Sequence, residues 1–369
     1  MSDLFLGLIT GTSVDAIDCA LLDCAGTRPA LVGTHSHALP PELQADIRRL
    51  QQPGEDGLDL LGATDHWLGE ELAAAALGLL AALRIEPRRI AAIGSHGQTV
   101  RHRPDGARPF TLQIGDPHRL AQRTGITVVA DFRRRDMAAG GQGAPFAPAF
   151  HQRMFAHRSQ SRAIVNLGGI ANVTLLPIGE NTLPTGSDCG PANTLLDLWF
   201  RAHHAGLAYD DQGAWAASGR LSEELLARLL DEPYFARRAP KSTGPELFSR
   251  GWLNARTAGL ELPPADIQRT LAELTAITVA RACAPAQTIH ACGGGAHNRF
   301  VLERIASRSG CAVDTTLALG IGPDWVEAAA FAWFARERLA GRPLALASIT
   351  GASENTISGA IYPGRLLEL

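Results

Sequence analysis

Eight consecutive residues near the start of the chain have the composition of a phosphate-binding turn. The segment GTSVDAID follows an apolar run and combines glycine, two hydroxyl side chains and two carboxylates. Backbone N–H groups and hydroxyls of a tight hairpin turn suit phosphate oxygens. The two carboxylates fit such a site only with a divalent cation, held mostly through water, between them and the anion. The alternative is a plain hairpin in which Asp and Ser satisfy turn amides. The residues concerned are Gly11, Thr12, Ser13, Val14, Asp15, Ala16, Ile17 and Asp18, with Asp15 and Asp18 as the cation's partners.

Two further glycine segments suit nucleotide binding. The turn Asn166–Asn172 (NLGGIAN) again lies between two apolar runs, so that two such hairpins could hold one polyphosphate. The run CGGGAHN lies between an expected strand and an expected helix, where bare backbone can contact adenine or ribose and a helix N-terminus can face phosphate. Close strand–helix packing is the alternative for this second segment. The candidate residues are Gly168, Gly169, Asn172, Gly293, Gly294, Gly295 and Asn298.

Four polar side chains are candidates for chemistry or substrate contact. Asp188 falls in GSDCGPAN, a segment that predicts a turn leading into a helix, where it is either a catalytic base or a helix cap. Gln98 and Arg133 each follow an apolar strand, at the end where α/β proteins often bind ligands. Glu327 begins an otherwise apolar helix, as a first-turn acid or a substrate ligand. A polar turn and a solvated charged loop are the alternatives for Gln98 and Arg133.

Composition and missing motifs exclude several classes of protein. The 369 residues carry a net charge of −3, which gives no basic field for nucleic acid or an anionic membrane. Neither GxxxxGK[ST] nor a GxGxxG between strand and helix occurs, which excludes P-loop, Rossmann and protein-kinase sites. The six cysteines are scattered without a CxxC pair, as in a protein with reduced thiols. The most apolar run, Leu72–Leu83, is shorter than a membrane span, and the start of the chain lacks a signal-peptide pattern. We expect a cytoplasmic protein without nucleic-acid or membrane partners.

Strand and helix patterns interleave along the chain, which predicts an α/β fold with mixed sheets. A strand, a glycine turn and a second strand open each half, so the pattern indicates an internal repeat. The segment Met137–Pro148, rich in glycine, alanine and proline, predicts a hinge between the halves. Expected strands include Phe5–Thr10, Asp18–Cys24, Ala30–Ala38, Ile90–Ser95, Ala163–Asn166, Asn172–Pro177 and Thr288–Ala291, and expected helices include Pro41–Gln51, Leu58–Leu83, Pro264–Ala282 and Pro323–Ala340.

Nine segments in order, covering Gly11 to Trp333, resemble the anhydro-N-acetylmuramic acid kinases. They are GTSVDAID, GSHGQTVRHRP, TLQIGD, VVADFRRRDMAAGGQGAP, VNLGGIANVT, SDCGPANTLLD, PKSTGPELF, CGGGAHN and GPDWVEAAAFAW, with GAIYPG following. The resemblance implies the superfamily of actin, sugar kinases and heat-shock chaperone ATPases. Its fold has two ribonuclease-H-like domains, each a mixed sheet flanked by helices, around a central cleft. We expect domains at 1–134 and 135–342, with the tail 343–369 returning to the first.

The resemblance also implies an activity and roles for residues. The family is an ATP- and Mg²⁺-dependent sugar kinase, a transferase of amino-sugar metabolism and peptidoglycan recycling. It converts 1,6-anhydro-N-acetylmuramic acid and water to N-acetylmuramic acid 6-phosphate. By this similarity Asp188 matches the catalytic aspartate and Gly11–Asp18 the ATP-binding segment, while Gln98, Arg133 and Glu327 are expected to contact the sugar. The small-molecule acceptor is the expected partner, and a homodimer is compatible with the sequence.

Departures from the family pattern concern turn geometry. The family has methionine and glycine where Val14 and Ala16 stand, and phenylalanine, threonine and often glycine at Ser187, Cys189 and Ala192. Alanine in a tight turn is strained only where φ is positive. Two other functions remain as alternatives: an ordinary hydroxyl-phosphorylating sugar kinase of the same superfamily, and a nucleotide-driven switch without enzymatic activity.

Overall fold

A computed structural model describes residues 3–11, 13–52, 54, 57–180, 182–239, 241–244 and 246–364. Thr12, one of the predicted phosphate-binding residues, lies outside these described residues. The chain forms two compact units, with residues 1–150 and 325–369 in unit 1 and residues 151–324 in unit 2.

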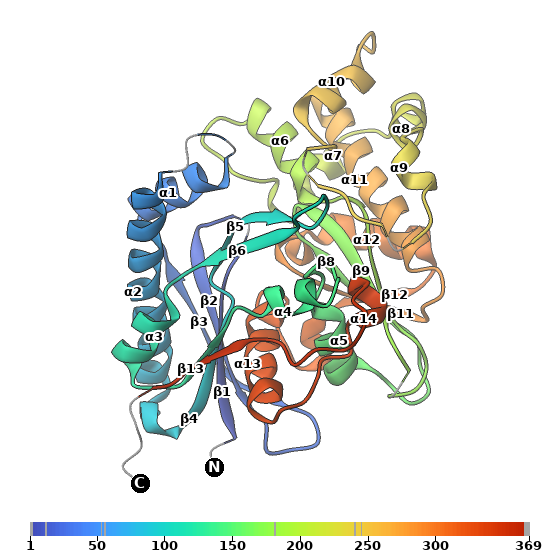
Figure 1. Cartoon of the computed structure of the whole chain (residues 1–369). Coiled ribbons are helices and arrows are strands. Elements are labelled where there is room, and N and C mark those ends of the chain that lie inside the picture. The colour runs from blue at the N-terminus through green and yellow to red at the C-terminus, as the bar shows by residue number, and fades with distance from the viewer. Residues whose placement is uncertain are drawn as a thin grey trace. The chain divides into compact units, whose positions relative to one another are not determined.

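Unit 1 is built on a six-stranded mixed sheet of order β13-β7-β4-β1-β2-β3 (Figure 1). Strand β1 pairs antiparallel with β2 and parallel with β4, and β4 pairs parallel with β7. A separate hairpin joins β5 and β6. The strands are β1 Leu4–Thr10, β2 Ala16–Asp23, β3 Ala30–Ala38, β4 Ile90–Ser95, β5 Gln98–Arg103, β6 Phe110–Ile114, β7 Val128–Ala130 and β13 Ala360–Tyr362. The helices are α1 Pro41–Gln51, α2 Leu58–Leu83, the 3₁₀ turn Pro87–Arg89, α3 Pro117–Thr124, α4 Arg133–Ala138, α13 Val326–Leu339 and α14 Ala347–Thr350, while α5 Ala147–Phe155 spans the boundary between the units.

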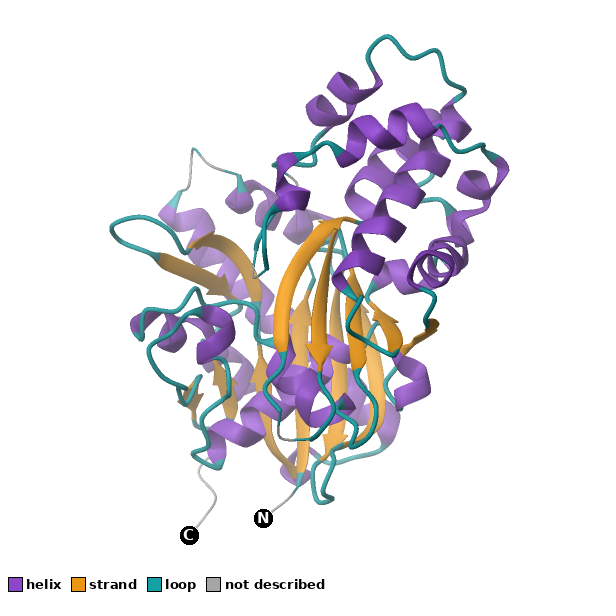
Figure 2. Cartoon of the chain, turned by 90° about the vertical axis from the view of Figure 1, so that its right-hand side faces the viewer, coloured by secondary structure: helices purple, strands orange, loops and turns teal. Residues whose placement is uncertain are grey.

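Unit 2 repeats the same strand order on a second sheet. Its order is β10-β9-β8-β11-β12, with β8–β9 and β9–β10 antiparallel and β11 parallel to both β8 and β12. Helices α6 to α11 gather in one cluster, drawn at the top in Figures 1 and 2. The strands are β8 Arg162–Leu167, β9 Ile170–Leu176, β10 Thr185–Pro191, β11 Thr288–Cys292 and β12 Ala312–Thr315. The helices are α6 Asn193–His203, α7 Ala214–Ser218, α8 Glu223–Leu230, α9 Pro233–Ala236, α10 Arg250–Thr257, α11 Pro264–Ala282 and α12 Arg299–Ser309, with 3₁₀ turns at Asp211–Gly213, Gly294–His297 and Thr316–Leu319.

The two sheets confirm the predicted fold class. In each unit a first strand pairs antiparallel with a second, the second with a third, and parallel strands extend the other edge. This common order is the internal repeat that the two glycine hairpins indicated. The units differ from the predicted domains in their boundaries, at 150 and 324 instead of 134 and 342. Helix α13 packs on β1, β4 and β2, so the chain returns to unit 1 before this helix and not after it.

The long helix α2 changes one expectation from the sequence. At 26 residues it is long and apolar enough to cross a membrane by length and composition, whereas the apolar run Leu72–Leu83 alone is too short. It contains Asp59, Asp65, Glu70 and Glu71, and its buried residues pack in the core of unit 1 against β3 and α3. These contacts are those of a core helix.

Two glycines bring α13 into direct contact with the sheet. A Cβ on Gly7 would lie 1.8 Å from the carbonyl oxygen of Ala328, and a Cβ on Gly94 would lie 1.9 Å from that of Phe331. Only glycine fits such a close approach of backbone to backbone. Helix α13 carries Glu327, one of the predicted substrate contacts, in its first turn.

We expect Gly94→Ala to lower the free energy of unfolding by about 3 kcal/mol, because the added methyl group must push α13 away from β4. The midpoint of urea-induced unfolding measures this change. Gly62→Ala is the matched control: a Cβ added to this residue of α2 would meet no atom within 4 Å, so alanine there should stabilise the helix by about 0.5–1 kcal/mol. Equal midpoints for the Gly94 variant and the wild type would contradict this account of the packing.

Candidate functional site

The hairpin between β1 and β2 forms the first predicted turn of unit 1. A backbone hydrogen bond of 3.2 Å from Val14 N to Gly11 O closes the turn. The Ser13 hydroxyl donates to the Asp15 carboxylate, and the Ser36 hydroxyl donates to Asp18 at 3.1 Å. Among the described residues no group of three or more His, Cys, Asp or Glu side chains could hold a metal ion. A cation at Asp15 and Asp18 would therefore take most of its ligands from phosphate and water, which is the usual arrangement for Mg²⁺.

Backbone strain falls on Val14 and not on Ala16. Val14 has φ 56°, in the left-handed region that a β-branched residue rarely adopts, and its side chain is buried. Ala16 is the first residue of β2 and is not among the described residues with positive φ. Ala192, with φ −119°, also lies outside the left-handed region. Ala16 and Ala192 therefore avoid the left-handed region, which Val14 alone of the three adopts.

A chain of hydrogen bonds links this hairpin to Arg133. Thr10, the last residue of β1, donates its hydroxyl to Gly97 O at 2.8 Å. The same carbonyl accepts from His96 Nδ1 at 3.0 Å, and His96 Nε2 accepts from Arg133 Nη2 at 3.0 Å. Burial, reinforced by the charge of Arg133, lowers the pKa of His96 to about 3, so the ring is neutral and its Nε2 is available as an acceptor. His96 thus holds the guanidinium that the sequence assigned to substrate contact.

Arg133 and Glu327 form an electrostatic pair in unit 1. Arg133 begins α4 and does not lie in the solvated charged loop that was the alternative from the sequence, and it also donates to Gly143 O at 2.8 Å. Surrounding protein raises the pKa of Glu327, although its side chain keeps access to solvent, and the charge of Arg133 opposes this shift. Gln98, at the start of β5, is buried, and its Oε1 has no hydrogen-bond partner among the described residues. Such groups can recognise the hydroxyls and the carboxylate of an acidic sugar.

In unit 2 the strand register places three polar residues next to one another on three neighbouring strands. Asn172 on β9 pairs with Asn166 on β8 and with Asp188 on β10. Asp188 therefore lies within a strand, and both the predicted turn and the predicted helix cap are wrong, because TGSDCGP pairs with β9 and helix α6 begins only at Asn193. The register shifts between Asp188 and Gly190, the kind of irregularity that re-aims a side chain in many active sites.

A loop from beyond the sheet fixes the Asp188 carboxylate. Thr243 N donates to Asp188 Oδ2 at 3.0 Å, and Asp188 N donates to Lys241 O at 3.0 Å. Lys241 Nζ in turn donates to Tyr234 O at 3.0 Å, and the Tyr234 hydroxyl donates to Asp188 O at 3.0 Å. Burial raises the pKa of Asp188, and the hydrogen bond from Thr243 opposes this shift. The segment PKSTGPELF, which resembles a segment of the family, contains Lys241 and Thr243, and its contact with this aspartate is not predictable from the sequence.

The two glycine segments of unit 2 lie against each other. A Cβ on Gly293 would lie 2.2 Å from Asn166 Oδ1, and one on Gly295 would lie 2.7 Å from Leu167 Cβ, so the run from 293 to 295 packs on the β8–β9 hairpin. Gly168 and Gly169 carbonyls accept the N–H groups of Asn193 and Thr194 at the start of α6, each at 3.0 Å.

The remaining residues of these segments differ in their surroundings. A Cβ added to Gly294 would meet no atom within 4 Å, which leaves open space beside the backbone. Asn298 caps α12, its Oδ1 accepting from Val301 N at 3.0 Å. The side chain of Asn298 thus has a capping contact within the chain. Its contact with a nucleotide stays a prediction.

We expect the acidic limb of the kcat/KM profile to lie above pH 3.8, the ordinary value for an aspartate. A base works only when ionised, and burial raises the pKa of Asp188, so activity should rise as pH increases through that shifted pKa. Steady-state rates with circular dichroism at each pH measure the profile and exclude acid unfolding. A rate that stays constant down to pH 3.8 in folded protein would contradict this assignment.

A duplicated mixed sheet, with a hairpin turn between the first two strands of each copy, defines the ribonuclease-H-like class of ATPases and sugar kinases. The model of one family within this class, described as anhydro-N-acetylmuramic acid kinase, matches residues 3–364. The chain belongs to the anhydro-N-acetylmuramic acid kinase family.

Named relatives agree over their whole length. The chain is 46% identical over 365 residues to an anhydro-N-acetylmuramic acid kinase of Shewanella loihica, covering 98% of each chain. It is 47% identical over 365 residues to one of Coxiella burnetii, covering 98% of this chain and 97% of the relative. Among solved structures, the activator of the 2-hydroxyisocaproyl-CoA dehydratase from Clostridium difficile matches with a TM-score of 0.47 and 11% identity, covering 92% of this chain and 96% of that one. A likeness at that level says nothing of the chemistry of this chain.

Proposed function

We propose that this protein is an ATP-dependent kinase that opens the 1,6-anhydro ring of 1,6-anhydro-N-acetylmuramic acid with water and phosphorylates the released 6-oxygen. The products are N-acetylmuramic acid 6-phosphate and ADP, and the reaction takes place in the cytoplasm, where ATP is available. The observation that carries the proposal is the alignment of Asp188 beside Asn172 and Asn166, next to the packed glycine turns of unit 2. The names of relatives at 46–47% identity support this acceptor over an ordinary hexose.

Asp188 acts as the general base in this proposal. Its carboxylate takes a proton from water while the water oxygen bonds to the anomeric carbon and the bond from that carbon to the 6-oxygen breaks. A carboxylate with a raised pKa suits this role, because its basicity is closer to that needed at neutral pH. Thr243 N holds the Oδ2 atom and leaves Oδ1 to meet the water. The freed 6-oxygen bonds to the γ-phosphorus, and the bond from that phosphorus to the ADP oxygen breaks.

Residues of unit 1 position the acceptor. Arg133, held by His96, binds the acid group or a ring oxygen of the sugar, and Glu327 accepts from a hydroxyl. The buried and unpartnered Oε1 of Gln98 accepts from another hydroxyl or from the amide of the N-acetyl group. Together these contacts bring the anomeric carbon to a fixed place, which is where much of the rate enhancement of such reactions arises.

The turns suit a metal-bound triphosphate. The β1–β2 hairpin offers hydroxyls and backbone amides, and Gly294 leaves room beside its backbone for adenosine. Mg²⁺, when bound, neutralises charge on the transferring phosphoryl group. Asp15 and Asp18 would hold it through water, since no larger cluster of ligands occurs among the described residues.

The direct experiment is an ADP-release assay with a panel of acceptors. We expect turnover with 1,6-anhydro-N-acetylmuramic acid and ATP, and none above background with glucose, N-acetylglucosamine or N-acetylmannosamine. Equal turnover with a free hexose, or ATP hydrolysis that no sugar stimulates, would contradict the proposal.

A further inference from the structure

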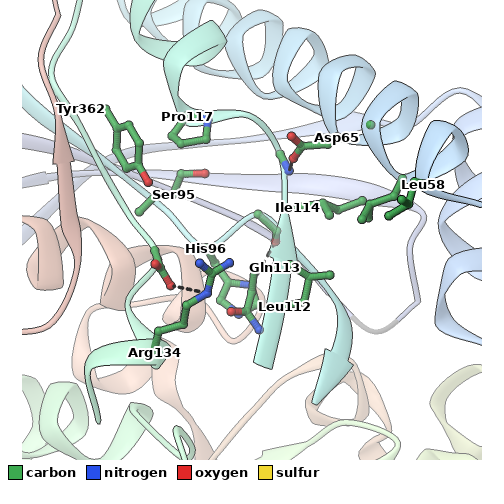
Figure 3. A pocket seen from close by; sticks show the side chains of 16 residues that line it. Leu58, Asp65, Ser95, His96, Leu112, Gln113, Ile114, Pro117, Arg134 and Tyr362 are labelled. Carbon is green, nitrogen blue, oxygen red and sulfur yellow. Dashed lines mark hydrogen bonds and ion pairs between the residues drawn. The ribbon is translucent and has the colours of Figure 1, made fainter. Parts of the chain in front are cut away.

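A separate cavity of about 380 Å³ opens in unit 1 beside the ends of β4 and β7 (Figure 3). Its volume is that of a small-molecule site. It lies between the start of α2 and the end of β6, with Ser95 at the end of β4 and Asp131 directly after β7. Gln98, Arg133 and Glu327, which the proposed function assigns to the acceptor, are not among the residues that line it.

One buried hydroxyl in this cavity lacks a partner. Ser95 is 1% exposed, lines the cavity, and its Oγ makes no hydrogen bond to any described residue. An unsatisfied buried hydroxyl costs about 1–3 kcal/mol unless something bonds to it. Figure 3 draws Ser95 and Tyr362 among the side chains that line the cavity. The Ser95 hydroxyl can therefore donate and accept hydrogen bonds in a cavity that no described residue fills.

The charges around the cavity select its ligand. Asp65 uses Oδ1 to accept from Gly115 N at 2.7 Å, which leaves its second oxygen for another donor. Arg134 Nε lies 3.4 Å from Asp131 Oδ1. Arg134 is the one arginine among the described residues that line the cavity, and its guanidinium therefore already has a carboxylate partner. Burial raises the pKa of both aspartates, and burial followed by the charges of Asp131, Asp116 and Asp65 raises the pKa of Tyr362. A phosphate or carboxylate would meet this negative charge, whereas hydroxyl donors would be accepted.

Apolar side chains complete the walls. Leu61, Leu112, Ile114 and Pro117 line the cavity together with the ring of Tyr362, and Leu58 at the rim is 83% exposed. Apolar side chains together with carboxylate acceptors suit a sugar ring, which has C–H faces and a rim of hydroxyls.

We propose that this cavity binds an uncharged, hydroxyl-rich small molecule, a neutral monosaccharide, at a site separate from the phosphoryl acceptor. The acceptor of the proposed function is an acid, which the two aspartates disfavour. His96 lines the cavity and also accepts from Arg133 at Nε2, so the cavity adjoins the predicted acceptor contacts without including Arg133.

Calorimetry on the full chain tests this site with two matched probes. N-acetyl-D-glucosamine is the neutral probe, and N-acetylmuramic acid is the same ring with a carboxylate. We expect the neutral sugar to bind with one site, and saturating 1,6-anhydro-N-acetylmuramic acid to leave its Kd unchanged. Ser95→Ala should weaken binding about fivefold to tenfold, whereas Ser353→Ala, an exposed serine of unit 1 outside the cavity, should not change it.

Three outcomes would overturn the inference: no heat with the neutral sugar at millimolar concentration, an unchanged Kd in Ser95→Ala, or displacement by the anhydro sugar. The last would make the cavity part of the acceptor site. Because the ADP-release assay is independent, absence of turnover together with intact neutral-sugar binding would reject the proposed function and leave this site standing.

Discussion

Asp188→Asn should reduce turnover with the anhydro sugar by about 10³-fold. The amide has the shape of the carboxylate but cannot take a proton from water, so ring opening loses its base. The variant tests the base and little else, because Thr243 N donates to Oδ2 and an amide oxygen accepts the same bond. Steady-state ADP release measures the effect.

Three controls separate this loss from misfolding. The melting temperature and the affinity for ATP should stay near the wild-type values, since the backbone contacts of Asp188 with Lys241 and Tyr234 do not involve its carboxylate. The residual activity should also lose the acidic limb described above. Near-normal turnover in the Asn variant would show that another group is the base.

Arg133→Ala should lower kcat/KM for the sugar by about 10²-fold, with little change in the KM for ATP. The side chain supplies a charged hydrogen bond to the acceptor, and a bond to a charged group contributes about 1.5–3 kcal/mol. At about 1.4 kcal/mol per tenfold change, the upper half of that range gives the predicted loss. Kinetics with each substrate varied in turn measure the split.

Arg133→Lys provides the matched variant. Lysine keeps the charge but cannot donate to His96 Nε2 and to Gly143 O with the fixed fork of a guanidinium. We expect an intermediate loss of kcat/KM for the sugar and little change in the KM for ATP. If Arg133→Ala unfolds, the lysine variant still tests the prediction: full activity in it would show that the reaction does not need the fixed fork of the guanidinium.

Several elements have the bounds that the sequence predicted. The helices Pro41–Gln51 and Leu58–Leu83 and the strand Ala30–Ala38 have the predicted bounds. In Pro41–Gln51 apolar residues recur at the period of a helix, and in Ala30–Ala38 they alternate roughly as in a strand. Leu58–Leu83 is rich in leucine and alanine and is too long for a strand. The sequence also predicted the repeat of a strand, a turn and a strand, and the structure adds that the two sheets share a strand order.

Asp188 shows where local composition misleads. The segment TGSDCGP contains glycine, proline and serine, residues typical of turns, yet it forms β10 because β9 offers a partner strand. Pairing across the sheet outweighs weak local preference. The boundary between the units lies after the glycine-rich run 137–148, which belongs to unit 1, where Gly143 N donates to Asp136 Oδ2 at 2.7 Å.

The residues that orient the site could not be predicted from spacing. Thr243 lies 55 residues from Asp188, and Arg133 lies 37 residues from His96. Their contacts depend on how loops return to the sheet, which no periodic pattern encodes. The polar turn after β4 was visible in the sequence, but only the structure shows that its histidine is neutral and accepts from Arg133.

Reaction in ¹⁸O-labelled water tests the central claim most directly. Mass spectrometry of the product, quenched early, should find one labelled oxygen at the anomeric carbon and none in the phosphate. Unlabelled N-acetylmuramic acid 6-phosphate kept in labelled water for the same time corrects for exchange. Product without label at the anomeric carbon, or with label in the phosphate, would contradict a water activated by Asp188 and a 6-oxygen that attacks ATP.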